Sequence, residues 1–488
     1  MTWPRLALLV LAGTLAADAA AGGDRQLLVV LDGLRPDYVR EEWMPNLVGV
    51  AERGVFFDRH HAIYPTVTRV NAASIATGAH PATHGLLGNT VYLPRVSPEP
   101  LSTSVRDNLL AIAAGEGRLL TVPTLGDALA TAGLRLFVGS AGSSGSSYLL
   151  DPDPDRGTIV HLEYAVPARL HAQIVAELGP VPAEATPNAA RNAWIVSAYL
   201  HHGMEADVGV LWLSDPDHTT HEHGIGSAAS LASLTAVDAE IGRIVGELEA
   251  RGELDRTNLL VTSDHGFSTH TGELSLSRLV ATAAAEIGMP IPVVAGSAIH
   301  LQPGSEDRLD ELADALRANP AVGAMFSAPS RPGSEIGRVP GTLSFDAIEW
   351  SHPRSAALLV APRGWPAANA IGWPGLSSSS GTAGHGGAGF HDVRNTLVAA
   401  GPAFRRGARS DLPSSNADLA PTICALLQIA CPPSMTGRPL VEALSSHRGP
   451  QPRADGWQTV VSVADYRLLG TFHRVAGRRY FESATVER

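Results

Sequence analysis

The chain has 488 residues, of which 44% are hydrophobic and 17% are charged. That length can bury a large core, either in two or three lobes or in one large α/β domain with insertions. The net charge of −12 does not favour a nucleic-acid-binding surface, so we expect no nucleic acid polymer as a partner. All 36 basic residues are Arg, which excludes a lysine as phosphate clamp, general base or Schiff-base former.

Residues 1–21 have the pattern of a signal peptide. Arg5 supplies a positive charge, and the apolar run Leu6–Ala17 is too short to span a bilayer. Small residues suited to cleavage follow, at Ala19 and Ala21. We therefore expect an exported protein, periplasmic or extracellular after cleavage; an uncleaved N-terminal anchor is the alternative. No other apolar run is long enough for a membrane helix, so we expect no stable membrane span.

The main domain, predicted over residues 24–445, contains four apolar, β-rich runs that predict strands. They are Gln26–Leu31, Val208–Leu213, Leu259–Thr262 and Thr396–Ala400. Helices are predicted over Pro45–Arg53, Thr68–Ala76, Ser230–Arg251 and Ala417–Leu427. The helix at Ser230–Arg251 is the clearest, because its apolar residues recur at helical spacing until Gly252 ends it.

Two stretches of this domain predict insertions. Residues 91–187 are irregular and rich in Pro, Gly and Ser, and we expect them to form part of a cap. Residues 290–375 predict a small α+β lobe around a helix at Asp307–Ala318. The Gly- and Ser-rich run Gly375–Gly389 is interpreted as a loop at the rim of a site, although such composition is typical of flexible linkers.

The C-terminal residues 446–488 predict a β-hairpin extension packed on the core, because the segment from Trp457 onwards alternates in polarity. The chain has two cysteines, Cys424 and Cys431. In an exported protein they could form one small disulfide loop, and a free buried pair is the alternative.

Asp and His residues follow several of the apolar runs. The candidates are Asp32 in LLVVLDG, Asp217 and His221 in SDPDHTTH, Asp264 and His265 in SDHG, and His385 in GTAGHGG. Ligands of open α/β sheets bind beyond the carboxyl ends of the strands, which is where three of these four segments place their side chains. Carboxylates and imidazoles together form a mixed O/N ligand set that suits zinc. A fifth segment offers Thr68 at the start of a predicted helix.

These motifs, in this order, resemble the type I phosphodiesterase/nucleotide pyrophosphatase family of the alkaline phosphatase superfamily. The similar segments are VVLDGLRPDY, YPTVTRVNAASIATGAHPATHGLLGN, SDPDHTTHEHG, SDHG, HGG, VAAGPAF and DLAPTICALL, between Asp32 and Pro439. Asp215 stands where the family usually has Glu. The resemblance implies an α/β fold, an alkaline-phosphatase-like three-layer sandwich with a mostly parallel central sheet.

The resemblance also implies two Zn²⁺ per chain and a role for each motif residue. One zinc would be held by Asp217, His221 and His385, and the other by Asp32, Asp264 and His265. Thr68 would lie between the metals as a ligand and nucleophile, and Asn89 would donate a hydrogen bond to a phosphoryl oxygen. Zinc lowers the pKa of a bound hydroxyl, so Thr68 could attack phosphorus and form a phospho-threonine that water then hydrolyses.

The chain departs from the family pattern after the nucleophile. Arg69 and Val70 stand where an aromatic residue and Pro are common, so a slot for stacking a nucleobase is in doubt. Arg69 could instead attract a second anionic group of the substrate, or could be a surface residue turned away from the site. The expected partner is a small phosphate ester, either a nucleotide or a phospholipid head group.

Three functions are consistent with these residues. The main hypothesis is a secreted zinc hydrolase that cleaves phosphate diester or pyrophosphate bonds. The first alternative is a phosphomonoesterase of the alkaline phosphatase type on the same metal core, with Arg69 helping to bind the dianion. The second is a non-catalytic protein that uses the metals to hold phosphate.

Overall fold

The computed structural model describes residues 24–153 and 157–488, so the predicted signal peptide lies outside the described residues. A nine-stranded central sheet has the order β22-β2-β21-β10-β1-β9-β6-β7-β8. Its strands are β1 (Arg25–Leu31), β2 (Gly54–Phe57), β6 (Leu136–Ser140), β7 (Thr158–His161), β8 (Ala165–Val166), β9 (Val208–Leu213), β10 (Thr257–Thr262), β21 (Leu397–Ala400) and β22 (Ala408–Ser410). The five strands from β10 to β7 run parallel, whereas β21 and β8 run antiparallel to their neighbours.

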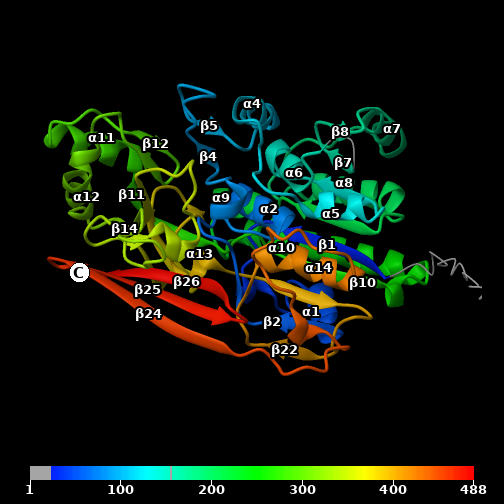
Figure 1. The fold of residues 1–488 in the computed structure, drawn as a ribbon. Helices are drawn as coiled ribbons and strands as arrows, with labels where there is room; N and C mark the ends of the chain where they lie inside the picture. The colour runs from blue at the N-terminus through cyan, green and yellow to red at the C-terminus, as the bar shows by residue number, and fades with distance from the viewer. Residues whose placement is uncertain (1–23, 154–156) are drawn as a thin grey trace, which may run out of the picture.

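Helices cover both faces of this sheet (Figure 1). Side chains alternate along β1, so Leu28 and Val30 enter one core while Leu27 and Val29 enter the other. The first core includes α2 (Thr68–Thr77), α4 (Arg106–Glu116), α5 (Leu125–Thr131), α6 (Ser144–Leu150) and α14 (Leu419–Leu427). The second includes α1 (Pro45–Glu52), α7 (Arg169–Leu178), α8 (Ala189–His202) and α10 (Ala228–Ala250). The predicted α/β fold with a mostly parallel central sheet is confirmed.

The predicted elements of the sheet and its helices lie within two residues of the observed ones. The helix predicted over Ser230–Arg251 begins earlier, at Ala228. Ser227 caps it, because its hydroxyl accepts a hydrogen bond of 3.1 Å from the Ser230 amide. The cap fixes the first turn, which the apolar pattern alone does not define.

The segment 91–187 differs from the expected cap. Its β6 pairs in parallel with β9, and β7 and β8 extend the central sheet beyond β6. The short run that forms β6 lies among Gly and Ser residues. Its hydrophobicity therefore differs less from that of its flanking residues than in the other central strands. Outside the sheet, this segment contributes the small hairpin of β4 (Thr90–Val91) and β5 (Leu101–Ser102).

A small lobe follows the central sheet strand β10. It contains α11 (Leu276–Glu286), α12 (Leu309–Arg317), β12 (Val293–Ala295), β13 (Ala298–His300), β14 (Val322–Ser327), β15 (Leu343–Ser344) and β16 (Leu358–Pro362). Apart from β15, these helices and strands share a core of their own, and the lobe begins with α11, before the expected start of the insertion at residue 290. The lobe and the segment carrying α7 and β8 lie at opposite ends of the view in Figure 1.

Smaller elements connect the lobe to the main sheet. The four-stranded sheet contains β17 (Gly364–Ala368), β18 (Pro374–Ser379), β11 (Ser268–Leu274) and β19 (Ala383–Gly384). The remaining elements near the site are α3 (Pro81–His84), α9 (Asp217–His223), α13 (Phe390–Val393), β3 (His60–His61), β20 (Arg394–Asn395) and β23 (Ser414–Ser415). The run Gly375–Gly389 is therefore partly strand, and only its second half forms the loop that carries His385.

The C-terminal segment contains one strand more than the expected hairpin. β24 (Ala454–Val463), β25 (Tyr466–Val475) and β26 (Arg478–Glu487) form an antiparallel meander, red in Figure 1. It packs on the core through aromatic residues that include Phe472 and Phe481. Both Cys424 and Cys431 are free thiols. Among the described residues, no helix has the length and apolar character that crossing a membrane requires.

Candidate metal centre and active site

Three adjacent parallel strands place the predicted ligands at one edge of the central sheet. Asp32 directly follows β1, Asp264 and His265 follow β10, and Asp217 begins α9 shortly after β9. Because β1 lies between β10 and β9, these side chains meet at the carboxyl ends of all three strands. His221 lies one helical turn after Asp217. The β11–β19 pairing brings the neighbouring His385 to the same place, since Gly384 is opposite Ser268.

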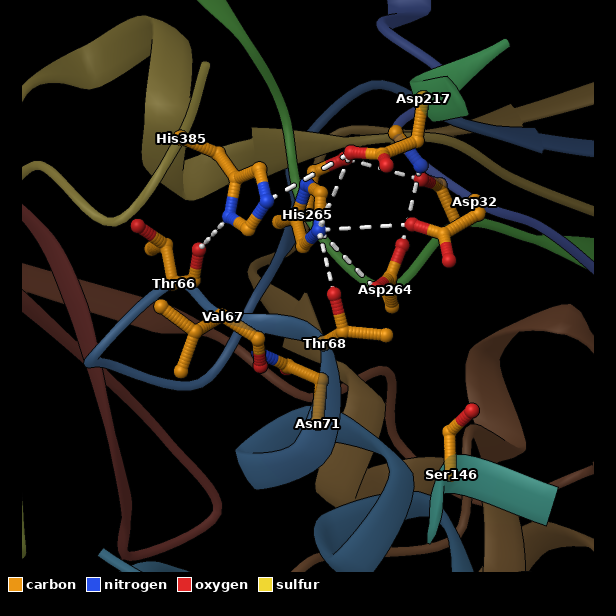
Figure 2. A network of polar contacts seen from close by, with 12 residues as sticks. Asp32, Thr66, Val67, Thr68, Asn71, Ser146, Asp217, Asp264, His265 and His385 are labelled. Atoms are coloured by element: carbon orange, nitrogen blue, oxygen red, sulfur yellow. Dashed lines mark hydrogen bonds and ion pairs between the residues drawn. The ribbon is translucent and has the colours of Figure 1, made fainter. Parts of the chain in front are cut away.

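The six predicted ligands form one cluster, which we call the metal edge: Asp32, Asp217, His221, Asp264, His265 and His385. His265 lies at its centre (Figure 2). Its Nε2 is 3.1 Å from Asp264 Oδ2, 3.4 Å from Asp32 Oδ1 and 3.9 Å from Asp217 Oδ1. Asp217 Oδ1 is in turn 3.2 Å from His221 Nε2 and 3.5 Å from His385 Nε2.

Two overlapping groups in this cluster could each hold a metal ion. Asp32, Asp264 and His265 form one group, with ligand atoms within 4.8 Å of one another, and this is one of the two predicted sets. The other group joins Asp217 and His385 to His265, where the resemblance implied His221. His221 lies within reach of Asp217 but has a more exposed side chain. The assignment of each histidine to one metal stays a prediction.

The three histidines are oriented by backbone carbonyls. The Nδ1 atoms of His265, His221 and His385 lie 3.0, 3.0 and 2.8 Å from the carbonyl oxygens of Gly266, Ala383 and Thr66, respectively. A carbonyl oxygen can only accept, so each Nδ1 carries the proton and each Nε2 presents a lone pair. This is the arrangement that metal-binding histidines use in proteins.

The carboxylates also fit bound cations. Asp32 Oδ1, Asp217 Oδ1 and Asp264 Oδ2 are buried and accept no hydrogen bond from the described part of the chain. Burial and the negative charges of Asp264 and Asp217 raise the pKa of Asp32 well above its usual value. Buried anionic oxygens without partners are strongly destabilising. Divalent cations would neutralise them, and this mixture of oxygen and nitrogen donors suits zinc.

Thr68 points its hydroxyl at the metal edge (Figure 2). It is buried, and its Oγ1 lies 3.3 Å from His265 Nε2. The N-cap of α2 is Val67, in an extended conformation, so Thr68 is the first helical residue and does not serve as the cap. The Thr68 hydroxyl is therefore held by the start of a helix, and it faces the same space as the unpartnered carboxylate oxygens.

Asn89 and Arg69 lie beside Thr68. The Asn89 Oδ1 accepts a hydrogen bond of 3.0 Å from the Arg69 amide, which leaves the Nδ2 end of the side chain as the donor. Arg69 lines an open cleft of about 320 Å³ together with Thr68 and Asp32. The alternative in which Arg69 turns away from the site is therefore not the conformation observed. The phosphate-binding role of Asn89 stays a prediction.

The opposite side of this cleft comes from segments for which the sequence predicted no role. We call residues 141–144, 161–163 and 181–191 the cleft wall; all three segments contribute lining residues. Asp215, the residue that replaces the usual Glu, connects this wall to the metal edge. Its Oδ2 accepts from the Asn188 amide at 2.8 Å, and its Oδ1 accepts from the Thr219 hydroxyl at 2.7 Å.

Sequence reasoning missed the residues that support the cluster from behind. The Trp212 Nε1 donates to Asp32 Oδ2 at 2.9 Å. The Asn416 Nδ2 donates to Asn71 Oδ1 and to the Asp264 carbonyl, both at 2.9 Å, and so ties the Thr68 helix to the Asp264 loop. A polar Asn71 within a helix of small buried residues is a weak signal for such a role. No local pattern marks Asn416, because its partners are distant in sequence.

Solved structures share this fold. The fold is similar to alkaline phosphatase PafA (TM-score 0.66, 16% identity, covering 88% of this chain and 100% of that chain). It is also similar to murine ectonucleotide pyrophosphatase/phosphodiesterase 5, as an inactive threonine-to-alanine variant in complex with AMP (TM-score 0.61, 19% identity, covering 86% of this chain and 100% of that chain). At these identities the similarity establishes the fold.

The family follows from the sequence comparison. The model described as type I phosphodiesterase / nucleotide pyrophosphatase matches residues 26–388, and the chain belongs to this family of hydrolases. The chain is 24% identical over 414 residues to bis(5′-adenosyl)-triphosphatase of Mus musculus, covering 83% of this chain and 77% of that protein. It is 26% identical over 270 residues to a venom phosphodiesterase of Crotalus durissus collilineatus, covering 54% of this chain. The match spans only 28% of that venom protein.

Proposed function

We propose that the chain is an exported two-zinc hydrolase that cleaves phosphate diester or pyrophosphate bonds through a phospho-threonine on Thr68. One observation carries this proposal: a buried threonine hydroxyl faces three unpartnered carboxylate oxygens and three oriented imidazoles at the carboxyl edge of the sheet. Family membership supports the reaction class. Export rests on the signal-peptide pattern at residues 1–21.

The residues of the site have distinct tasks. Asp217, His221 and His385 would hold one zinc, and Asp32, Asp264 and His265 the other. Zinc supplies Lewis acidity and lowers the pKa of a bound hydroxyl.

With its proton removed, Thr68 Oγ1 attacks phosphorus in line with the leaving group. The bond from phosphorus to the leaving oxygen breaks, and the phosphoryl group is carried on Thr68 until water hydrolyses it. The Asn89 Nδ2 donates to a non-bridging oxygen. The first amides of the ten-residue helix α2 add donors and a favourable dipole for the anion.

Of the arginines that line the cleft, Arg69 is the one free to bind the second charge of a monoester dianion. The cleft wall at residues 141–144 has the sequence Ala-Gly-Ser-Ser and brings no cationic side chain to the phosphate. Of the two arginines that line the cleft, Arg191 already pairs with Glu184 at 3.2 Å. Phosphate monoesters carry about two negative charges at neutral pH and are usually bound by additional cations. Family membership makes diester or pyrophosphate hydrolysis the preferred reaction, and Arg69 keeps monoester hydrolysis as the alternative.

The names of the relatives suggest one substrate class. A bis(5′-adenosyl)-triphosphatase and a structure in complex with AMP both point to nucleotides. The second of these is also an inactive threonine-to-alanine variant, which supports a catalytic threonine in the fold. For this chain we infer a small phosphate ester with a nucleotide-type or phospholipid-type leaving group.

The test compares bis-p-nitrophenyl phosphate with p-nitrophenyl phosphate, using zinc-loaded wild type, Thr68→Ala and Thr68→Ser. We expect the diester to be hydrolysed faster, and Thr68→Ala to lose at least about a thousandfold in kcat, as enzymes do without their nucleophile. Thr68→Ser is the matched control, because it keeps the hydroxyl. Full activity of Thr68→Ala contradicts the mechanism. Faster monoester hydrolysis supports the phosphatase alternative, and phosphate binding without turnover supports a binding protein.

A further inference from the structure

The cleft beside Thr68 contains a cation without a partner. In the described part of the chain, no ion pair and no side-chain hydrogen bond involves the Arg69 guanidinium, and its Nε is buried. Arg69 is only partly buried, so the rest of its guanidinium is open to the cleft and free to bind an anion.

The other arginine of the cleft shows the contrast. Arg191 pairs with Glu184 at 3.2 Å, and its Nε donates to the Pro182 carbonyl at 3.0 Å. Its charge and its donors are therefore satisfied within the protein. Both arginines line the same cleft, so only Arg69 presents an unused cation to a bound molecule.

The nearby carboxylates are not available as partners of Arg69. Asp32, Asp217 and Asp264 carry three negative charges, whereas the two dications that they would bind carry four. The metal-loaded edge therefore leaves no spare anion for a guanidinium. Since no Phe, Tyr or Trp ring is among the residues lining the cleft, the site also lacks a platform for stacking a base. The group of the cleft that remains free to recognise a substrate is therefore a cation, the Arg69 guanidinium.

We propose that Arg69 forms a subsite for a second acidic group of the substrate, next to the phosphate that reacts. This inference rests on the proposed function and names the residue that selects among its substrates. Arg69 directly follows Thr68, so an acid close to the reacting phosphorus lies within its reach. A guanidinium binds phosphate or carboxylate through two parallel hydrogen bonds, which also fixes the orientation of the substrate.

Two matched pairs of substrates test this subsite. The first pair is the p-nitrophenyl ester of AMP, with one negative charge, and ATP, which adds the acidic β- and γ-phosphates. The second pair is p-nitrophenyl phenyl phosphate and its 4-carboxyphenyl counterpart. Zinc-loaded wild type, Arg69→Gln and Arg191→Gln are compared on all four. Arg191→Gln is the control, because it removes an arginine of the same cleft whose charge is already paired.

We expect Arg69→Gln to lower kcat/KM roughly ten- to hundredfold on a substrate with the second acid, the usual loss for a charge-assisted hydrogen bond. The loss on its singly charged partner should stay below about threefold, and Arg191→Gln should leave the ratio within a pair unchanged. A selective loss on ATP alone identifies a phosphate as the acid. A selective loss on the carboxylate alone identifies a carboxylate, and a loss on both shows a general subsite. Equal losses within both pairs, or none, overturn the proposal.

A binding measurement separates this inference from the catalytic proposal. Calorimetric titration with pyrophosphate and with inorganic phosphate is performed on wild type, Arg69→Gln and Thr68→Ala. The subsite predicts that Arg69→Gln weakens pyrophosphate binding roughly ten- to hundredfold while phosphate binding changes by less than about threefold. That result stands even when no substrate is turned over, which would contradict only the proposed function. An equal weakening of both anions overturns the subsite and leaves the catalytic proposal intact.

Discussion

The metal edge and the cleft wall face the same cleft but depend on different parts of the fold. The metal edge is held by three central parallel strands that pair over most of their length. The cleft wall consists of the start of α6, the end of β7, the start of α8 and their connecting segments, near the edge of the sheet, where β7 pairs with the two-residue strand β8. The ends of the central strands therefore position the metal ligands, while segments nearer the edge of the sheet surround the rest of the substrate. This division lets the leaving-group specificity change without disturbing the chemistry.

The contrast extends to the charges of the two regions. The metal edge concentrates three carboxylates, each with one buried oxygen that accepts no hydrogen bond from the described residues, so it depends on bound cations. The cleft wall contains an ion pair of its own, between Arg191 and Glu184. The first region is therefore incomplete without metal, and the second is complete without it. This difference predicts how each region responds when the metal is removed.

Metal removal should have the largest effect. A chelator should lower turnover by at least about a thousandfold, and zinc should restore it, because the metals supply the Lewis acidity of the reaction. At a zinc concentration of roughly 1,000 times Kd, binding should stabilise the fold by about 4 kcal/mol. Hydrogen exchange followed by mass spectrometry should then show faster exchange at the ends of β1 and β10 after chelation, and little change at residues 141–144. Equal changes in both places would contradict the division into two regions.

The two regions also differ in how far the sequence predicts them. Motifs such as SDHG follow strongly apolar runs, and a strand that ends before an Asp fixes where that Asp must lie. The strand β6 has no such contrast, so a segment that belongs to the central sheet was expected in a cap. Its place depends on pairing with β9, which is distant in sequence. Local sequence patterns predict where the central strands end. Which further strands extend the sheet beyond β9 depends on tertiary pairing.

The same reason explains which site residues were missed. Thr68 and the six ligands lie in short motifs whose residue types indicate metal binding and nucleophilic attack. Asn416 and Trp212 act through hydrogen bonds to Asp264 and Asp32, and their effect is visible only when the elements are assembled. Whether the Arg69 side chain has an ion-pair partner likewise depends on which residues surround it in the fold. A sequence can show a cation beside the nucleophile, but only the fold shows that this cation forms no ion pair with residues 24–153 and 157–488.

Trp212 offers a test of intermediate size. Trp212→Phe removes the donor to Asp32 Oδ2 while leaving the six ligands in place. We expect zinc affinity to fall roughly 10- to 100-fold, the usual effect of losing a group that orients a metal ligand. Trp194→Phe is the matched control, because its Nε1 donates to the Gly179 carbonyl, away from the cluster. Competition with a zinc-binding dye measures both variants, and an equal loss in the two would show that packing, and not the hydrogen bond, is responsible.

Asp215 provides the test with the smallest expected effect, because it joins the two regions. Its carboxylate accepts from the Asn188 amide and from the Asn192 side chain on one oxygen, and from Thr219 on the other. Asp215→Asn keeps the size but replaces one acceptor with a donor that faces other donors. We expect the free energy of unfolding in urea to fall by about 1–3 kcal/mol, the range for a buried polar group without a partner.

The exposed Asp411→Asn is the control for this change and should stay within about 0.5 kcal/mol of wild type. The kinetic outcome of Asp215→Asn then decides how independent the regions are. Asn188 belongs to the cleft wall, and Thr219 belongs to the helix that begins with Asp217. If the wall is a separate unit, Asp215→Asn should raise KM while zinc affinity stays within about threefold of wild type. A parallel loss of zinc affinity would mean that this carboxylate makes the wall and the metal edge one cooperative structure, and that substrate specificity cannot change without altering the metals.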